Sequence, residues 1–256
     1  MPQVLQTLGQ RTLPAQTTID AARHWILSCG WGLTGAETPA EKATLDHAFA
    51  ETAVFLASMR GFPATVPGGP RAPIAPYWLV FVGVSGTGKT MLARSVVEFL
   101  KLHMDRMYRE TVAPTLGDGD MRRSMFFAQK GALFAPWRDL CPVDTAARER
   151  LTNAQEDWFK VIDELKAQTG DRTLIPRGDA KVEGVVPKVF ELNAAGDLLD
   201  ARLRKWTIVT TNHRLSELSR FWDVRIASRL KRDGAVLCDL SDCRDFAIRR
   251  EAALNL

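Results

Sequence analysis

Blocks of apolar residues alternate with amphipathic segments along this chain of 256 residues. The runs 77–82, 158–163 and 206–211 consist mainly of apolar and β-branched residues, as strands buried on both faces of a parallel sheet do. Lys160 is an exception, because a central parallel strand is usually apolar on both faces. Apolar residues recur at every third or fourth position elsewhere, which predicts helices. The alternation predicts an α/β fold with a parallel sheet flanked by helices.

Two helices are predicted before the first strand. Thr17 or Thr18 can cap the first of them. The second has a stronger start signal, because Thr38 can serve as N-cap and Glu41, three residues later, completes a capping box. Apolar residues between 45 and 59 recur at helical spacing, so this helix either covers an edge of the core or binds a partner protein.

A segment rich in proline and glycine follows these helices. Five prolines and a Gly-Gly pair lie between residues 61 and 76, and neither helix nor sheet persists in such a composition. We therefore expect a small helical N-terminal extension at 1–61, which begins with a loosely held arm. A linker at 62–76 and a larger core at 77–256 complete the predicted organisation.

The loop after the first strand carries the strongest chemical signal. Its sequence at 83–90, Gly-Val-Ser-Gly-Thr-Gly-Lys-Thr, fits the pattern G-x-x-x-x-G-K-T between a strand and a helix. Backbone N–H groups in such a loop turn toward a bound phosphate, and the next helix adds its positive N-terminal dipole. We expect Lys89 to reach the β- and γ-phosphates of ATP and the Thr90 hydroxyl to ligate Mg²⁺. The expected phosphate-binding residues are Gly83, Ser85, Gly86, Thr87, Gly88, Lys89 and Thr90.

Polar residues end the other two predicted strands. Asp163 and Glu164 close the second run, where one carboxylate can hold Mg²⁺ and the other can polarise the attacking water. Asp163 is the expected metal residue and Glu164 the expected general base. Asn212 follows the third run, at the sheet edge where ligands bind in open α/β folds, so it can hold the attacking water. Its alternative role is the N-cap of the next helix.

A further helix is predicted at 223–230, with Arg225 and Arg229 on it. An arginine fixed at the end of such a helix can reach the γ-phosphate that a neighbouring subunit holds and offset charge in the transition state. Only an oligomer can use an arginine in this way.

Two other stretches carry basic residues. A candidate strand at 124–128 lies within a region whose basic and aromatic residues suit either a nucleic-acid backbone or a solvated rim over core aromatics. The stretch 166–188 is irregular in sequence, so we expect either a pore or DNA-facing loop or a disordered excursion. The residues concerned are Arg122, Arg123, Lys130, Phe134, Trp137 and Arg138 in the first stretch and Arg172, Arg177 and Lys181 in the second.

Composition narrows the class of protein only slightly. An apolar content of 46% suits a folded core, and a formal charge of +4 is compatible with a nucleic-acid partner without requiring one. The four cysteines form no C-x-x-C pair, so the sequence suggests neither a zinc site nor a disulfide framework. No apolar run approaches the roughly 20 residues of a membrane span, and no signal peptide is evident, so we expect a cytoplasmic protein without a membrane partner.

The order of these motifs resembles the AAA+ ATPases of the DnaC/DnaI helicase-loader and IstB transposition-helper group. The resemblance covers roughly 77–246, and D-V-R-I-A-S-R-L at 223–230 is its most discriminating part. It implies a P-loop NTPase core without a full C-terminal lid domain. The roles that it implies are Walker A for Lys89 and Thr90, Walker B for Asp163 and Glu164, sensor 1 for Asn212, arginine finger for Arg229 or else Arg225, and a sensor 2-like nucleotide contact for Arg244.

The same resemblance implies an oligomer that hydrolyses ATP with Mg²⁺ and engages DNA. The first hypothesis is a loader of a replicative helicase that binds single-stranded DNA in replication initiation. A transposition helper, with a transposase as its partner, is the alternative. Two other hypotheses are a P-loop kinase for a small molecule, which has no need for the carboxylate pair and Asn212, and a nucleotide-gated binding module with little turnover.

Overall fold

A five-stranded parallel sheet forms the centre of the molecule, in the order β2-β3-β6-β1-β7. The computed structural model describes residues 13–31, 38–59, 76–111, 133–177, 180–232 and 234–245. The strands of the sheet are β1 (Trp78–Val82), β2 (Phe134–Pro136), β3 (Phe159–Asp163), β6 (Trp206–Thr211) and β7 (Val236–Asp239). The expected α/β class with a parallel sheet is confirmed.

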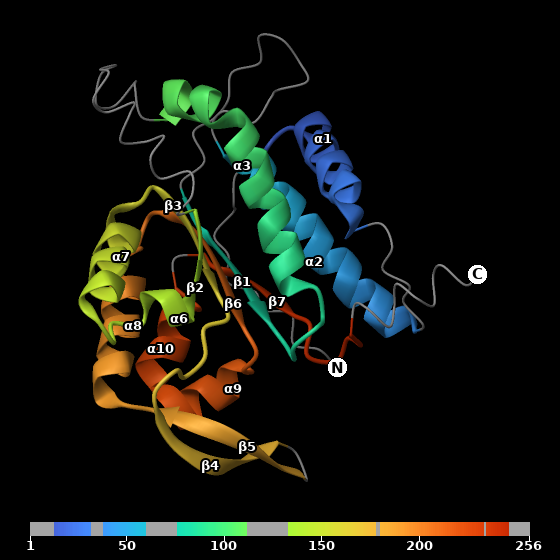
Figure 1. Ribbon diagram of the computed structural model, residues 1–256. Helices are drawn as coiled ribbons and strands as arrows, with labels where there is room; N and C mark the ends of the chain where they lie inside the picture. The colour runs from blue at the N-terminus through green and yellow to red at the C-terminus, as the bar shows by residue number, and fades with distance from the viewer. Residues whose placement is uncertain are drawn as a thin grey trace.

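Helices cover both faces of this sheet (Figure 1). One face carries α1 (Gln16–Ile26), the π-helical turn η1 (Leu27–Trp31), α2 (Pro39–Ser58) and α3 (Lys89–Thr111). The other carries α6 (Trp137–Leu140), α7 (Thr145–Glu156), α8 (Val189–Ala201), α9 (Leu215–Glu217), the π-helical turn η3 (Leu218–Trp222) and α10 (Val224–Arg229). None of these described helices has the length and apolarity that crossing a membrane requires.

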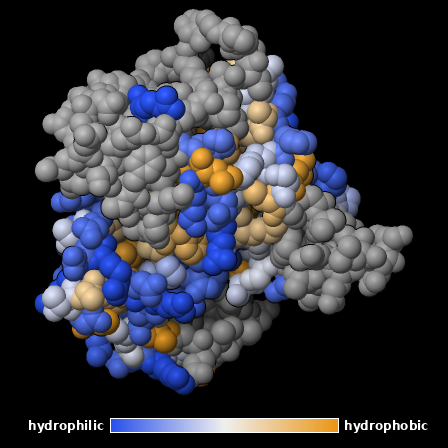
Figure 2. Space-filling view, turned by 45° about the horizontal axis from the view of Figure 1, so that its top comes forward, coloured by the Kyte–Doolittle hydropathy of each residue, from blue (hydrophilic) through white to orange (hydrophobic). Residues whose placement is uncertain are grey.

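Successive side chains of β1 point to opposite faces of the sheet and so contribute to the hydrophobic clusters on both faces. Leu79 and Phe81 pack into the cluster beneath α1, α2 and α3, whereas Trp78, Val80 and Val82 pack into the cluster beneath α8 and α10. All five side chains are buried, because a central parallel strand is covered on both faces. On the outer surface that Figure 2 shows, hydrophilic residues interrupt the apolar ones over the described part of the chain.

The N-terminal helices pack on the sheet. Phe55 on α2 lies edge-on to the rings of Tyr77 and Trp206, with ring centroids 5.2 Å apart in both pairs. The Trp25 indole on α1 donates a hydrogen bond of 2.8 Å to the backbone oxygen of Ser95 on α3. These contacts favour the core-covering role of α2. The linker at 62–76 lies almost wholly outside the described residues, so the division into segments stays a prediction.

Of the two predicted helix N-caps, one is confirmed and the other is wrong. Thr38 caps α2 as expected, since its hydroxyl accepts a hydrogen bond of 3.1 Å from the backbone N–H of Glu41. The predicted cap of α1 was wrong: that helix begins at Gln16 after Ala15, whose side chain has no capping group.

The stretch after β3 is an antiparallel hairpin, and the expectation of an irregular loop or disordered excursion was wrong. Its strands are β4 (Gly170–Arg177) and β5 (Ala180–Pro187). A two-stranded ribbon is all edge, so it tolerates prolines that a central strand excludes. Gly170 is required at the base of the hairpin, where β4 begins and β5 ends, because a Cβ there would lie 1.8 Å from the carbonyl oxygen of Val186. The candidate strand at 124–128 lies outside the described residues.

Candidate functional site

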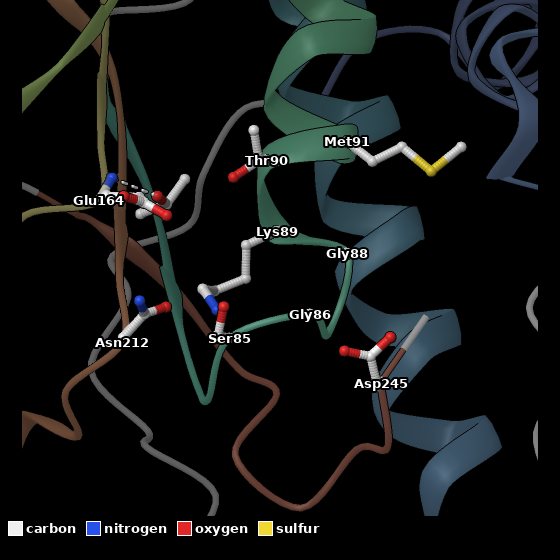
Figure 3. A pocket seen from close by; sticks show the side chains of 10 residues that line it. Ser85, Gly86, Gly88, Lys89, Thr90, Met91, Glu164, Asn212 and Asp245 are labelled. Atoms are coloured by element: carbon white, nitrogen blue, oxygen red, sulfur yellow. Dashed lines mark hydrogen bonds between the residues drawn. The ribbon is translucent and has the colours of Figure 1, made fainter. Parts of the chain in front are cut away.

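A cavity of about 320 Å³ opens at the carboxyl edge of the sheet, where β1, β3 and β6 end side by side. In Figure 3 the side chains of Lys89, Glu164 and Asn212 face the same space, while Met91 points away from it. The residues that line the cavity are Ser85, Gly86, Gly88, Lys89, Thr90, Met91, Glu164, Thr210, Asn212 and Asp245. The structure thus brings together side chains that the sequence places as far apart as 85 and 245.

Backbone geometry explains the glycines of the loop between β1 and α3. Gly83 has a φ of +145°, and a Cβ there would lie 2.7 Å from the backbone carbon of Leu240. Gly86 and Gly88 also have positive φ values, of 82° and 99°, which favour glycine. The loop therefore curls tightly against the end of β7 and delivers α3 with its first residue, Lys89, at the cavity.

Lys89 is folded onto this loop. Its Nζ donates hydrogen bonds to the carbonyl oxygens of Gly83 (2.9 Å) and Val84 (2.6 Å). Burial lowers the pKa of the ammonium to about 8, although the charges of Asp163 and Glu164 act in the opposite direction. An anion in the cavity would favour the protonated form, so the group suits a phosphate ligand.

Thr90 and Asp163 meet across the sheet edge as the sequence predicts. The Thr90 hydroxyl donates a hydrogen bond of 2.9 Å to Oδ1 of Asp163, which is buried. A hydroxyl and a carboxylate are oxygen ligands of the kind that Mg²⁺ prefers, and such sites take further ligands from phosphate and water. Among the described residues no cluster of three or more His, Cys, Asp or Glu side chains forms a metal site. The pair therefore fits Mg²⁺ bound together with a phosphate.

Glu164 has an unusual backbone. Its φ of 53° lies in the left-handed region, and its N–H donates a hydrogen bond of 2.9 Å to the Thr210 hydroxyl. The carboxylate lies 3.0 Å from Nζ of Lys166, and both side chains are 42% exposed. Glu164 follows the last residue of β3 and lines the cavity (Figure 3).

Asn212 lines the cavity at the end of β6, between the loop and the acidic pair. Its alternative role as an N-cap is wrong, because α9 begins at Leu215 with Arg214 as the N-cap residue. Glu217 closes that turn by accepting a hydrogen bond of 3.0 Å from the Arg214 N–H.

The two candidate finger arginines do not line the cavity of their own chain. Arg229 packs on α8, where Nε donates a hydrogen bond of 2.6 Å to Asp200 and a second nitrogen reaches the other carboxylate oxygen, leaving its side chain 15% exposed. Arg225 pairs with Asp223 at 2.7 Å, yet its side chain is 65% exposed. Of the two, Arg225 is the more accessible to another molecule.

Arg244 does not line the cavity, although the next residue, Asp245, does. Its backbone N–H and guanidinium donate hydrogen bonds of 3.0 and 3.3 Å to the buried carboxylate of Glu41 at the start of α2. Glu41 therefore links the start of α2 to Arg244. The nucleotide-contact role of Arg244 stays a prediction.

Three cavity residues, Met91, Thr210 and Asp245, were not predicted as site residues from the sequence, and Met91 points away from the cavity in Figure 3. Thr210 looks like any β-branched strand residue, and Asp245 follows Arg244 in a segment without a distinctive pattern. The Asp245 carboxylate lies against the loop, since a Cβ on Gly86 would be 1.8 Å from its Oδ2. Figure 3 shows this carboxylate beside Gly86. It is an acidic group at a site otherwise suited to an anion.

The basic and aromatic stretch divides into a core part and a part outside the described residues. Trp137 is fully buried and donates a hydrogen bond of 2.8 Å to Glu191, so it cannot stack on a base. Arg94 lies over the Phe134 ring at 5.0 Å. Arg138 is exposed. Arg122, Arg123 and Lys130 lie outside the described residues, as do the side chains of Arg177 and Lys181, whereas Arg172 is exposed on β4.

Comparison of the sequence with models of known protein families gave no match, and comparison with curated proteins gave no significant match. The interpretation of the site therefore depends on its own geometry and chemistry.

Proposed function

We propose that the protein binds ATP with Mg²⁺ in this cavity and hydrolyses it, as an oligomeric AAA+ ATPase of the P-loop class that acts on DNA. One observation carries the proposal: a glycine loop with its lysine, a hydroxyl–carboxylate pair, a second carboxylate and an amide converge on one cavity from β1, β3 and β6. No single part of this arrangement is specific, but together they supply each group that phosphoryl transfer to water needs.

Each residue has a defined part in the proposed reaction. The loop N–H groups and Lys89 bind the phosphates, and Lys89 exchanges its loop carbonyl partners for phosphate oxygens. Thr90 and Asp163 would hold Mg²⁺, which when bound offsets negative charge on the phosphate oxygens. Asn212 orients a water, and Glu164 accepts the proton of that water as its oxygen bonds to the γ-phosphorus and the bond to the ADP oxygen breaks.

Self-assembly is part of the proposal because both finger candidates lie outside the cavity of their own chain. An arginine from a second copy would complete the site, and Arg225 is the accessible one. The resemblance of the motif order supports helicase loading on single-stranded DNA as the biological role. Transposition helpers share that resemblance, so a transposition helper with a transposase as its partner is the alternative.

Hydrolysis is tested with the purified full chain, by measuring phosphate release from ATP with Mg²⁺ over a range of protein concentrations, with and without single-stranded DNA. The rate per chain should rise with concentration. Glu164→Gln should bind ATP and lose at least about 100-fold in rate, because general-base catalysis contributes about 10²–10⁴. Glu98→Gln, an exposed change on α3, is the matched control and should behave as wild type.

The two arginines give a second, independent measurement. Arg225→Ala should abolish the rise of the rate with protein concentration and leave ATP affinity unchanged, whereas Arg229→Ala should lower stability by removing its bond to Asp200. Loss of concentration dependence only in Arg229→Ala would reverse this assignment. A rate that never depends on concentration, in wild type or variants, would contradict an oligomeric site.

A further inference from the structure

Thr210, on β6 beside β3, is hydrogen-bonded to both acidic residues of the site. It lies near the carboxyl end of β6, which is hydrogen-bonded to β3 on one side and to β1 on the other. The side chain is fully buried and its hydroxyl has two partners of different kinds. It donates a hydrogen bond of 2.7 Å to Oδ1 of Asp163 and accepts one of 2.9 Å from the N–H of Glu164.

We infer that Thr210 is a positioning residue, whose hydroxyl fixes the geometry of both Asp163 and Glu164 for hydrolysis. This inference depends on the proposed function. Thr210 acts through the two acidic residues and contacts neither the phosphates nor the water. Loss of its hydroxyl should therefore affect turnover more than nucleotide binding.

The direction of the hydrogen bonds supports this role. A threonine hydroxyl has one proton to donate, and Thr210 gives it to Asp163 while its lone pair takes the Glu164 N–H. The two bonds form a chain from the Glu164 backbone through Thr210 to Asp163, and bonds in such a chain polarise and strengthen one another. Oδ1 of Asp163 thus receives two hydroxyl protons, from Thr90 and Thr210, which sets the rotation of the carboxylate.

The backbone of Glu164 explains why a fixed partner is needed. A glutamate with a φ of 53° is in a conformation that residues with a Cβ rarely adopt, so surrounding bonds must hold it. The next residue contributes as well: the Leu165 N–H donates to the Thr210 carbonyl, and its own carbonyl accepts from the Thr211 hydroxyl, both at 2.8 Å. Lys166 pairs with the Glu164 carboxylate, whereas the Thr210 hydroxyl accepts the hydrogen bond from the backbone N–H of this strained residue.

Loss of the hydroxyl would leave the Glu164 N–H without this acceptor and Asp163 with one hydroxyl donor in place of two. The carboxylate of Glu164 would then sample more positions, and a displacement of about 1 Å can lower a rate about 100-fold. The Gly83–Lys89 loop makes none of the described hydrogen bonds to the Thr210 side chain, so phosphate binding should persist.

The test compares Thr210→Val, Thr210→Ser and Thr207→Val in the full chain. Valine keeps the branched shape and removes the hydroxyl, whereas serine keeps the hydroxyl. Thr207 is also fully buried on β6 but bonds to Arg202 and Lys205 at the other end of the strand, so its valine variant controls for loss of a buried hydroxyl. The measurements are kcat and KM for ATP, Tm, and the affinity for ADP with and without Mg²⁺.

Thr210→Val should lose at least about tenfold in kcat with KM within about threefold, and Mg²⁺ should increase its ADP affinity less than in wild type. Thr210→Ser should stay within about threefold of wild type in all of these, and Thr207→Val should lower Tm without lowering kcat. A wild-type kcat in Thr210→Val, or an equal loss of kcat in both valine variants, overturns the inference while leaving the ATPase intact. A wild-type protein that neither binds nor hydrolyses ATP overturns the proposed function, and this inference with it.

Discussion

The two ends of the central sheet both gather charged side chains, but they use them differently. At the carboxyl end, Lys89 and Glu164 border an open cavity. At the amino end, Lys160 lies with its Nζ 2.6 Å from Asp157, and both side chains are at most 3% exposed. The fully buried Arg202 beside them donates hydrogen bonds to the backbone oxygens of Ala154 (3.1 Å), Asp157 and Trp206 (2.6 Å) and to the Thr207 hydroxyl (3.1 Å).

The difference lies in what can replace the partners of each cation. Both groups are held away from water, and this burial lowers the pKa of Lys89 to about 8 and that of Arg202 to about 10. The partners of Arg202 lie on α7, on β6 and at Asp157, between α7 and β3, so the packing of these elements fixes them. Lys89 holds carbonyls of a loop that faces a cavity, so a ligand can take their place. We propose that a buried charge contributes to stability at the amino end and to ligand binding at the carboxyl end.

The largest effect should come from the amino end. Arg202→Met leaves several buried carbonyls without a donor and Asp157 with one cation fewer, so the free energy of unfolding should fall by about 3–5 kcal/mol. Denaturant unfolding measures this change. The exposed Arg148→Met on α7 is the control and should change stability by less than about 0.5 kcal/mol. A loss of ATP affinity in folded Arg202→Met would show that the two ends are not independent.

Lys89→Ala should have the opposite profile. Charge-assisted hydrogen bonds contribute about 1.5–3 kcal/mol, so ATP affinity should fall by about 10- to 100-fold. The free energy of unfolding should change little, because burial of the Lys89 ammonium carries a desolvation cost and the alanine variant no longer has that cost. Titration with a fluorescent ATP analogue measures the affinity, with Lys101→Ala on the same helix as control. Retention of wild-type affinity would contradict the assignment of the phosphate loop.

The part of the site that the sequence predicts is the part encoded locally. Lys89 lies in a contiguous motif, and Asp163 and Asn212 each follow an apolar run, so a parallel sheet suffices to bring their ends together. Their chemical roles stay predictions. The sequence indicated only part of the charged cluster at the amino end. Lys160 was unusual for a central strand, whereas no pattern marked its partner Asp157.

Long-range contacts account for what the sequence did not reveal. Arg244 and Glu41 are 203 residues apart, and nothing in either segment indicates that they pair. Thr210 gains its role from residues on β3, 46 and 47 positions away. The hairpin of β4 and β5 was missed because its prolines and glycines are read as loop signals, although they fit a ribbon that has two free edges.

A pH titration tests the carboxyl end through two properties that depend on Lys89. The folded-state pKa of Lys89 is lowered from 10.5 to about 8, so ATP affinity should fall about tenfold between about pH 7 and pH 9 as the free ammonium loses its proton. Stability should change in the other direction: because the unfolded chain keeps this proton up to its higher pKa, the contribution of Lys89 to stability rises with pH from about 8 to 10.5. Lys89→Ala is the control, and its weaker affinity should not vary over this range.

The smallest effect concerns the carboxylate that opposes binding at the open end. Asp245 lies against Gly86 and lines the cavity, so in the proposed complex its negative charge would repel the phosphates of the nucleotide. Asp245→Asn keeps the shape and removes the charge, and it should tighten binding of ADP and ATP by about threefold, with the larger gain for ATP. The gain should shrink as salt concentration rises, because the groups are near solvent. Asp242→Asn, an exposed change three residues earlier, is the control. Weaker binding in Asp245→Asn would contradict this prediction. It would mean that the carboxylate attracts the nucleotide, by bonding to the hydroxyl groups of the nucleotide or to the metal bound with it.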